Sequence, residues 1–172
     1  YFGHDEFAEF APGLKSIDDA LELRGRIYGA FEIAELLDDP EAAEQWLTFV
    51  VIGAGATGVE VAGQIRELSS RALRHDFRRI NPADAKVILV DAGDQVLASF
   101  GEGLGERSKK ALEKLNIGVR LGHTVTGMDA QTVELTDKDG TKHVIKSNCK
   151  VWAAGVSASS LGRKLGEQTG AA

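Results

Sequence analysis

The feature that most constrains the fold is a glycine-rich turn that joins a dense apolar run to an amphipathic stretch. Residues 47–52 (Leu-Thr-Phe-Val-Val-Ile) are mostly β-branched and apolar, which is typical of a strand buried on both faces of a parallel sheet. Residues 53–58 (Gly-Ala-Gly-Ala-Thr-Gly) follow at once, and from Val59 apolar residues recur at helical spacing as far as Ala72. A strand, a glycine turn and a helix in this order indicate the first unit of a dinucleotide-binding fold.

Each glycine of this turn has a distinct expected role. We expect Gly53 to make the tight turn out of the strand, Gly55 to let the backbone approach a pyrophosphate, and Gly58 to let the helix pack close to the strand. The first helical turn, which holds Ala56 and Thr57, adds free N–H groups and a partial positive charge that favour an anion. Glycines alone would also suit an ordinary turn between strand and helix, so the flanking elements carry the prediction.

An acidic residue ends the second apolar run. Residues 86–90 (Lys-Val-Ile-Leu-Val) predict another buried strand, and Asp91 closes it, where a carboxylate can accept hydrogen bonds from the adenosine ribose hydroxyls. Asp91 lies 33 residues beyond Gly58, more than the usual ~20, and residues 69–85 account for the excess as an extension of the helix or its loop. A carboxylate repels a 2′-phosphate, which favours NADH over NADPH, although Asp91 would also suit the start of a loop.

The rest of the chain completes an α/β pattern. We expect a Rossmann-like parallel sheet flanked by helices, together with a three-stranded antiparallel β-meander. The helix predicted over residues 102–116 should turn Leu104, Ala111, Leu112 and Leu115 inward. The remaining predicted helices cover residues 16–37, 40–46 and 102–116, and the remaining predicted strands cover residues 118–121, 125–128, 132–135, 142–145 and 150–155.

Composition excludes several classes of function. The chain has 172 residues and a formal net charge of −6, which argues against nucleic-acid binding, and no run approaches the ~20 apolar residues of a membrane span. The one cysteine, Cys149, cannot form an internal disulfide and is expected to be a buried small hydrophobe. The histidines at positions 4, 75, 123 and 143 are scattered and lack metal-ligand spacing, so no metal site is expected.

The glycine turn and three other stretches carry a family resemblance. Residues 50–63 (Val-Val-Ile-Gly-Ala-Gly-Ala-Thr-Gly-Val-Glu-Val-Ala-Gly) resemble the NADH-binding segment of the pyridine nucleotide-disulfide oxidoreductase superfamily. They most resemble the type II NADH dehydrogenases, which are non-proton-pumping NADH:quinone oxidoreductases, and among them the mycobacterial members. The other matching stretches are residues 1–3 with 14–20, residues 89–92 with 96–97, and residues 151–156 (Val-Trp-Ala-Ala-Gly-Val).

The resemblance implies a domain organisation. Residues 1–46 would be a connector and helix leading in from an FAD domain, residues 47–156 the NADH-binding domain, and residues 157–172 the start of the return to the FAD domain. The chain has one glycine fingerprint, does not begin with Met and ends in Gly-Ala-Ala, so we expect a soluble piece of a longer protein. This piece would lack the FAD and quinone sites and would be inactive alone.

For the whole protein, the resemblance implies electron transfer from NADH through FAD to a quinone, with menaquinone expected. Such a protein would lie at the cytoplasmic face of the cell membrane, which it would touch only through regions outside this chain, and a homodimer is an open option. Two alternatives remain: the NADH domain of another flavin-dependent reductase, of the ferredoxin or nitrite reductase type, and a non-catalytic NADH-binding module.

The resemblance also implies further site residues. Glu60 would lie near the nicotinamide carboxamide, although it would also complement the helix dipole as a plain surface residue. Gly155 would leave room for the nicotinamide at the end of the last strand. No catalytic residue is assigned within this chain. The candidate NADH-binding residues are Gly53, Gly55, Ala56, Thr57, Gly58, Glu60, Asp91, Ala92, Ala154 and Gly155.

Overall fold

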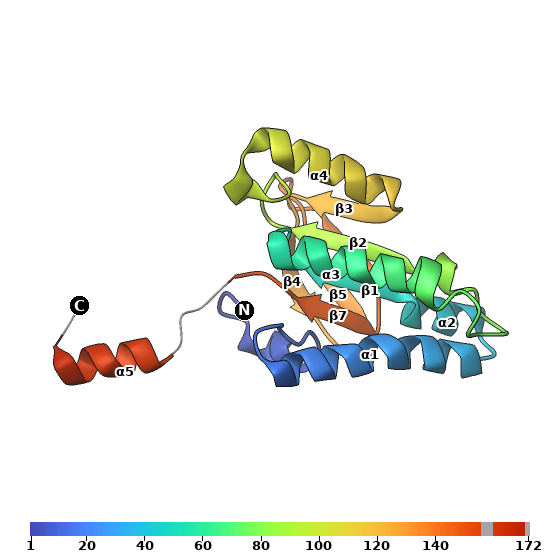
Figure 1. Cartoon of the computed structure of the whole chain (residues 1–172). Coiled ribbons are helices and arrows are strands. Elements are labelled where there is room, and N and C mark those ends of the chain that lie inside the picture. The colour runs from blue at the N-terminus through green and yellow to red at the C-terminus, as the bar shows by residue number, and fades with distance from the viewer. Residues whose placement is uncertain (156–159, 171–172) are drawn as a thin grey trace.

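A four-stranded parallel sheet forms the centre of the computed structural model, which describes residues 1–155 and 160–170. Its strand order is β3-β2-β1-β7 (Figure 1). Ile52 at the end of β1 is aligned with Val90 on one side and with Trp152 on the other, so the turns that follow these strands lie together at one edge. The strands are β1 (Thr48–Ile52), β2 (Lys86–Asp91), β3 (Ile117–Leu121) and β7 (Cys149–Trp152).

Helices cover one face of this sheet. The order β1, β2, β3 advances in one direction, so right-handed crossovers place the connecting helices α3 and α4 on the same face. Figure 1 shows α1 and α3 in front of the sheet and α4 beside β3. The helices are α1 (Ile17–Leu36), α2 (Pro40–Trp46), α3 (Ala56–Glu67), α4 (Glu102–Lys114) and α5 (Ser160–Thr169).

Helix α1 belongs to the same core as the strands. Ser16 and Asp19 form a capping box, in which the Asp19 N–H donates to Ser16 Oγ at 3.1 Å and the Ser16 N–H donates to Asp19 Oδ2 at 2.8 Å. One stripe of the helix is then buried, with Phe31 packing against Phe49 of β1 at a ring-centroid distance of 5.3 Å. The predicted connector therefore packs as part of this unit, while its role as a link from an FAD domain stays a prediction.

An antiparallel sheet covers the second face. Its strands are ordered β4-β5-β6, and Figure 1 shows them behind the parallel sheet. Alternate residues of β1, Val50 and Ile52, point into a second apolar cluster that includes Val133 and Leu135 of β5. The strands are β4 (Thr124–Met128), β5 (Thr132–Thr136) and β6 (Lys142–Lys146).

A buried lysine ties the two sheets together. Lys150 of β7 is 1% exposed, and its Nζ donates to the carbonyls of Asp129, Ala130 and Ser147, each at 2.8 Å. Burial lowers the pKa of Lys150 to about 8. The three bonds satisfy an ammonium group that would otherwise be costly to bury, and they fix the turn between β4 and β5 against the parallel sheet.

The predicted fold class is confirmed, with differences of detail. The meander, and not a second helix layer, covers the far face of the parallel sheet. In α4 only Leu112 among the four predicted inward residues is buried, because Leu104 and Leu115 are 45% and 50% exposed and Ala111 is exposed. Residues 157–159, 171 and 172 of the predicted return segment lie outside the described residues. Within residues 1–155 and 160–170, no helix is long and apolar enough to cross a membrane.

Candidate functional site

A pocket of about 580 Å³ opens at the carboxyl ends of the parallel strands. This is the edge at which ligands of open α/β sheets bind. Eight of the ten predicted residues line the pocket, and they come from the turns that follow β1, β2 and β7. These eight are Gly53, Gly55, Ala56, Thr57, Asp91, Ala92, Ala154 and Gly155.

Two glycines of the turn are required by close backbone packing. Gly53 has φ +109°, and a Cβ placed there would lie 2.6 Å from the backbone nitrogen of Ala154. A Cβ on Gly58 would lie 1.7 Å from the carbonyl oxygen of Gly53. Both distances are far inside van der Waals contact, so no side chain fits at either position. Gly58 does not line the pocket, because it faces the turn behind it.

Gly55 differs from these two glycines. It is the N-cap of α3, with φ −74° and ψ −175°, an extended conformation that any residue adopts. A Cβ placed there would meet nothing within 4 Å. The fold therefore does not require glycine at this position, but the pocket does, if a ligand is to approach the backbone. The first amides of α3 have no partner within the helix and, with its dipole, favour an anion here.

Asp91 braces the glycine turn. Its Oδ2 accepts a hydrogen bond from the Ala54 N–H at 2.6 Å, and its Oδ1 accepts one from the Gly93 N–H at 2.7 Å. Each carboxylate oxygen can accept a second bond, so both remain able to receive a ribose hydroxyl. The residue thus combines the loop-starting role and the ligand-facing position that its sequence context left open.

The strand β7 leads into the far side of the pocket. Gly155 has φ +74°, and a Cβ there would come within 3.0 Å of the Phe2 ring. Trp152 packs its ring against Tyr1 at a centroid distance of 4.8 Å, and its indole Nε1 donates to the Ala154 carbonyl at 2.8 Å. The aromatic N-terminal segment is therefore part of the pocket wall.

Sequence reasoning missed nine lining residues. Those from the N-terminus lie in a segment without periodicity, and those from residues 123–125 lie just after β3, whose carboxyl edge could have been suspected from the strand pattern. For the N-terminal lining residues, the available signal was the density of aromatic residues in the first ten positions. The missed residues are Tyr1, Phe2, His4, Ile52, His123, Thr124, Val125, Trp152 and Ala153.

Glu60 lies outside the lining. It is exposed, one turn into α3, and its predicted place near the nicotinamide carboxamide stays a prediction. Cys149 is buried, as expected, and burial raises the pKa of its thiol to about 12, so it is not a reactive thiolate.

The fold brings together two of the four histidines that are scattered in the sequence, and the absence of a metal site stays a prediction. The meander and the end of β3 bring His123 and His143 to a ring-centroid distance of 5.4 Å, with Asp137 beside them. Sequence spacing could not reveal this group, because its members are 14 and 6 residues apart and meet only through strand pairing.

Comparisons with known proteins agree with this geometry. A family model described as "Pyridine nucleotide-disulphide oxidoreductase" matches residues 10–172. Two Mycobacterium tuberculosis proteins, the type II NADH:quinone oxidoreductases Ndh and NdhA, are 56% and 54% identical over 169 and 167 residues. These matches cover 98% and 97% of this chain but 36% of each relative, so the chain spans about a third of their length.

A solved structure of NDH2 from Plasmodium falciparum in complex with NADH has the same fold. Its TM-score is 0.85 at 23% identity, and the match covers 93% of this chain and 33% of that one. The fold thus recurs in a protein whose sequence has diverged widely. The chain belongs to the pyridine nucleotide-disulphide oxidoreductase family.

Proposed function

We propose that this chain is the NADH-binding part of an NADH:quinone oxidoreductase that passes electrons from NADH through FAD to a quinone. The observation that carries the proposal is the pocket at the carboxyl edge, with the open backbone at Gly55 and the carboxylate of Asp91 on neighbouring turns. The sequence identities of 56% and 54% to Ndh and NdhA support a quinone reductase over another flavin-dependent reductase or a non-catalytic module.

The pocket residues fit a dinucleotide in three parts. The first turn of α3, with Ala56 and Thr57, would hold the pyrophosphate at backbone N–H groups. Asp91 would accept from the adenosine ribose. Gly155, at the far side of the lining, would leave space for the nicotinamide. When bound, NADH supplies a hydride, and the part of the protein is to orient and shield it.

The proposal includes finer assignments. Ala92 and Ala154 would contact the nucleotide beside Asp91 and Gly155, and Glu60 would accept from the nicotinamide carboxamide. We assign residues 47–156 to NADH binding, residues 1–46 to the lead-in from an FAD domain, and residues 157–172 to the return. Menaquinone would be the acceptor, and the whole protein would lie at the cytoplasmic face of the membrane, with a homodimer as an open option.

Calorimetric titration with NADH and with NADPH tests the nucleotide assignment. The chain should bind NADH more tightly, because the Asp91 carboxylate would repel a 2′-phosphate. In the Asp91→Ala variant, the ratio of the NADH affinity to the NADPH affinity should move closer to one. Since Asp91 also braces the glycine turn, the variant will weaken the binding of both nucleotides. Only the ratio of the two affinities therefore reports the ribose contact. Equal binding of the two cofactors by the unmodified chain would contradict the assignment.

A further inference from the structure

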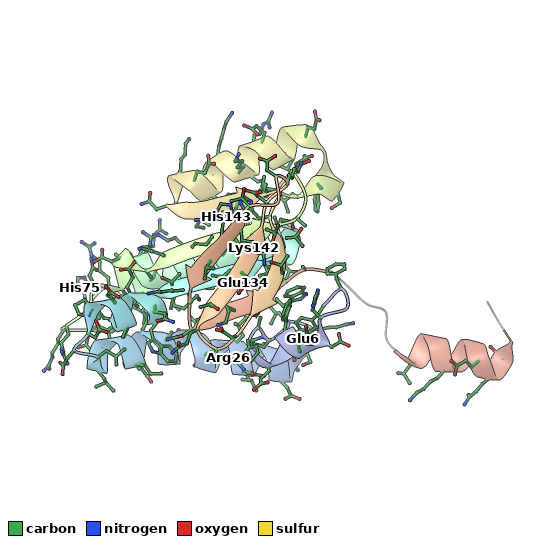
Figure 2. The ribbon with its side chains drawn as sticks, turned by 180° about the vertical axis from the view of Figure 1, so that it is seen from behind. Glu6, Arg26, His75, Glu134, Lys142 and His143 are labelled. Atoms are coloured by element: carbon green, nitrogen blue, oxygen red, sulfur yellow. The ribbon has the colours of Figure 1, made fainter. Side chains whose placement is uncertain are left out.

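A cluster of three metal-ligating side chains lies next to the pocket. His123 follows β3, Asp137 begins the turn between β5 and β6, and His143 lies on β6. Figure 2 labels His143 on the antiparallel sheet. One potential ligand atom from each residue lies within 4.8 Å of the other two. His123 also lines the pocket, so the cluster borders the nucleotide site without including the glycine turn.

The backbone holds two of these side chains in place. His123 Nδ1 lies 2.8 Å from the Leu121 carbonyl oxygen, which can only accept, so Nδ1 carries the proton and Nε2 presents its lone pair. Asp137 Oδ1 accepts from the N–H groups of Asp139 at 3.0 Å and Thr141 at 2.8 Å. Such hydrogen bonds to the atoms that do not bind metal are the support that histidine and carboxylate ligands have in metal sites.

The third side chain faces the free carboxylate oxygen. His143 Nε2 lies 2.9 Å from Asp137 Oδ2. Lys138, the next residue along the turn, pairs with Asp94 and so does not occupy this carboxylate. The side chains of His143 and Asp137 are 36% and 23% exposed, which leaves the cluster accessible from solvent. An ion pair explains His143 and Asp137, but it gives no role to the lone pair of His123.

We propose that His123, Asp137 and His143 bind a divalent zinc ion, with water at the fourth position. Two imidazoles and one carboxylate are the donor set of an open zinc site. Zn–N and Zn–O bonds of ~2.0–2.2 Å in a tetrahedron place ligand atoms roughly 3.4 Å apart. The 2.9 Å pair of Asp137 and His143 opens slightly, and the other donors close by side-chain rotation from at most 4.8 Å.

The test is calorimetric titration of the metal-free 172-residue chain with ZnCl₂, followed by visible spectroscopy with Co²⁺ as a probe of geometry. We expect one Zn²⁺ per chain and a tetrahedral Co²⁺ spectrum. His123→Gln and His143→Gln should each weaken Zn²⁺ at least about 10-fold. The affinity for Zn²⁺ should also fall as the pH is lowered, because protons compete with the metal for its ligands.

Two histidines outside the cluster supply matched controls. His75→Gln removes an exposed histidine, and His4→Gln removes a histidine paired with the Glu6 carboxylate at 3.0 Å. Neither should change the affinity for Zn²⁺. Circular dichroism establishes that each variant is folded, and the Co²⁺ spectrum of the unmodified chain stands independently of the variants. Equal affinities in the cluster and control variants, or an octahedral Co²⁺ spectrum in the unmodified chain, would overturn the proposal.

Discussion

Each end of the parallel sheet carries a cavity, but the polar groups at the two cavities differ. At one end they mostly bond to one another, and at the other they line the space open to a ligand. The cavity at the amino end has a volume of about 470 Å³, comparable to the carboxyl-end pocket. Four of its five charged lining residues pair with one another, Arg79 with Asp38 and Lys86 with Glu44. At the carboxyl end the lining instead includes glycine turns, a helix N-terminus and the Asp91 carboxylate, beside the aromatic N-terminal segment.

A carboxylate beside the amino-end cavity is likewise hydrogen-bonded within the protein. Glu35 of α1 accepts hydrogen bonds from the N–H groups of Arg78, Arg79 and Ile80, at distances between 2.9 and 3.1 Å. These hydrogen bonds fix the loop that follows α3, and the Glu35 carboxylate does not face a ligand. Cavity volume therefore does not distinguish a binding site from a packing gap, whereas the direction of the polar groups does.

The largest expected effect comes from disrupting the glycine turn at the carboxyl end of the sheet. Gly58→Ala would place a Cβ 1.7 Å from the Gly53 carbonyl oxygen, and backbone cannot move away as a side chain can. We expect the free energy of unfolding to fall by about 3 kcal/mol or more, with loss of NADH binding. Chemical denaturation measures the first effect and calorimetry the second.

Gly63 offers the control on the same helix. A Cβ there would meet nothing within 4 Å, so Gly63→Ala should stabilise α3 by roughly 0.5–1 kcal/mol and leave NADH affinity unchanged. If the two substitutions had the same effect on stability, the close contact of Gly58 with Gly53 would not be what positions the helix.

An intermediate effect is expected at the amino end. Glu35→Ala should lower the melting temperature and speed hydrogen exchange at residues 78–80, since three amides lose their acceptor, while NADH affinity stays within about twofold. A large loss of NADH affinity would show that the two ends are coupled and would break the contrast between them.

The same residue gives a pH dependence. Burial alone would raise the pKa of Glu35, but the hydrogen bonds from the three amides outweigh it and lower the pKa below its ordinary value of 4.5. The unfolded chain then binds the proton more tightly, so this contribution is present above pH 4.5 and is lost as the pH falls through the folded pKa. Glu35→Ala should flatten the stability profile in that acidic window.

The smallest effect is expected for an ion pair at the amino end. Lys86 and Glu44 are 57% and 58% exposed, and water screens such pairs. Lys86→Ala should change the free energy of unfolding by no more than about 1 kcal/mol and leave NADH binding unaltered. A larger change, measured by urea denaturation, would mean that the charges around this cavity do more than pair at the surface.

Local patterns account for what the sequence predicted well. The strand, glycine turn and helix at residues 47–72 are specified by neighbours in the chain, and so is the turn at Asp137 between β5 and β6. The meander was visible as alternation over short runs. The spacing of Leu104 and Leu115 indicates burial, but both are exposed beside β3, the edge strand of the parallel sheet. How much partner surface a helix face meets is a tertiary property that periodicity does not report.

What the sequence could not predict depends on contacts across long stretches of chain. Tyr1 reaches the pocket because it packs against Trp152, and nothing near either residue indicates the pairing. His123 and His143 meet because β3 lies in one sheet and β6 in the other, and the two sheets pack face to face. The sequence predicts Asp91 as a site residue but not its bond to the Ala54 amide, because that bond joins segments 37 residues apart in the chain.

The most direct measurement of the central claim is NADH affinity in the Gly55→Ala variant. Its extended backbone accepts alanine and the added Cβ meets no protein atom within 4 Å, so folding stability should be unchanged. If the pyrophosphate lies against this backbone, the methyl group occupies its place, and NADH affinity should fall at least about 10-fold while Gly63→Ala binds normally. A folded Gly55→Ala variant that binds NADH as tightly as the unmodified chain would contradict the account.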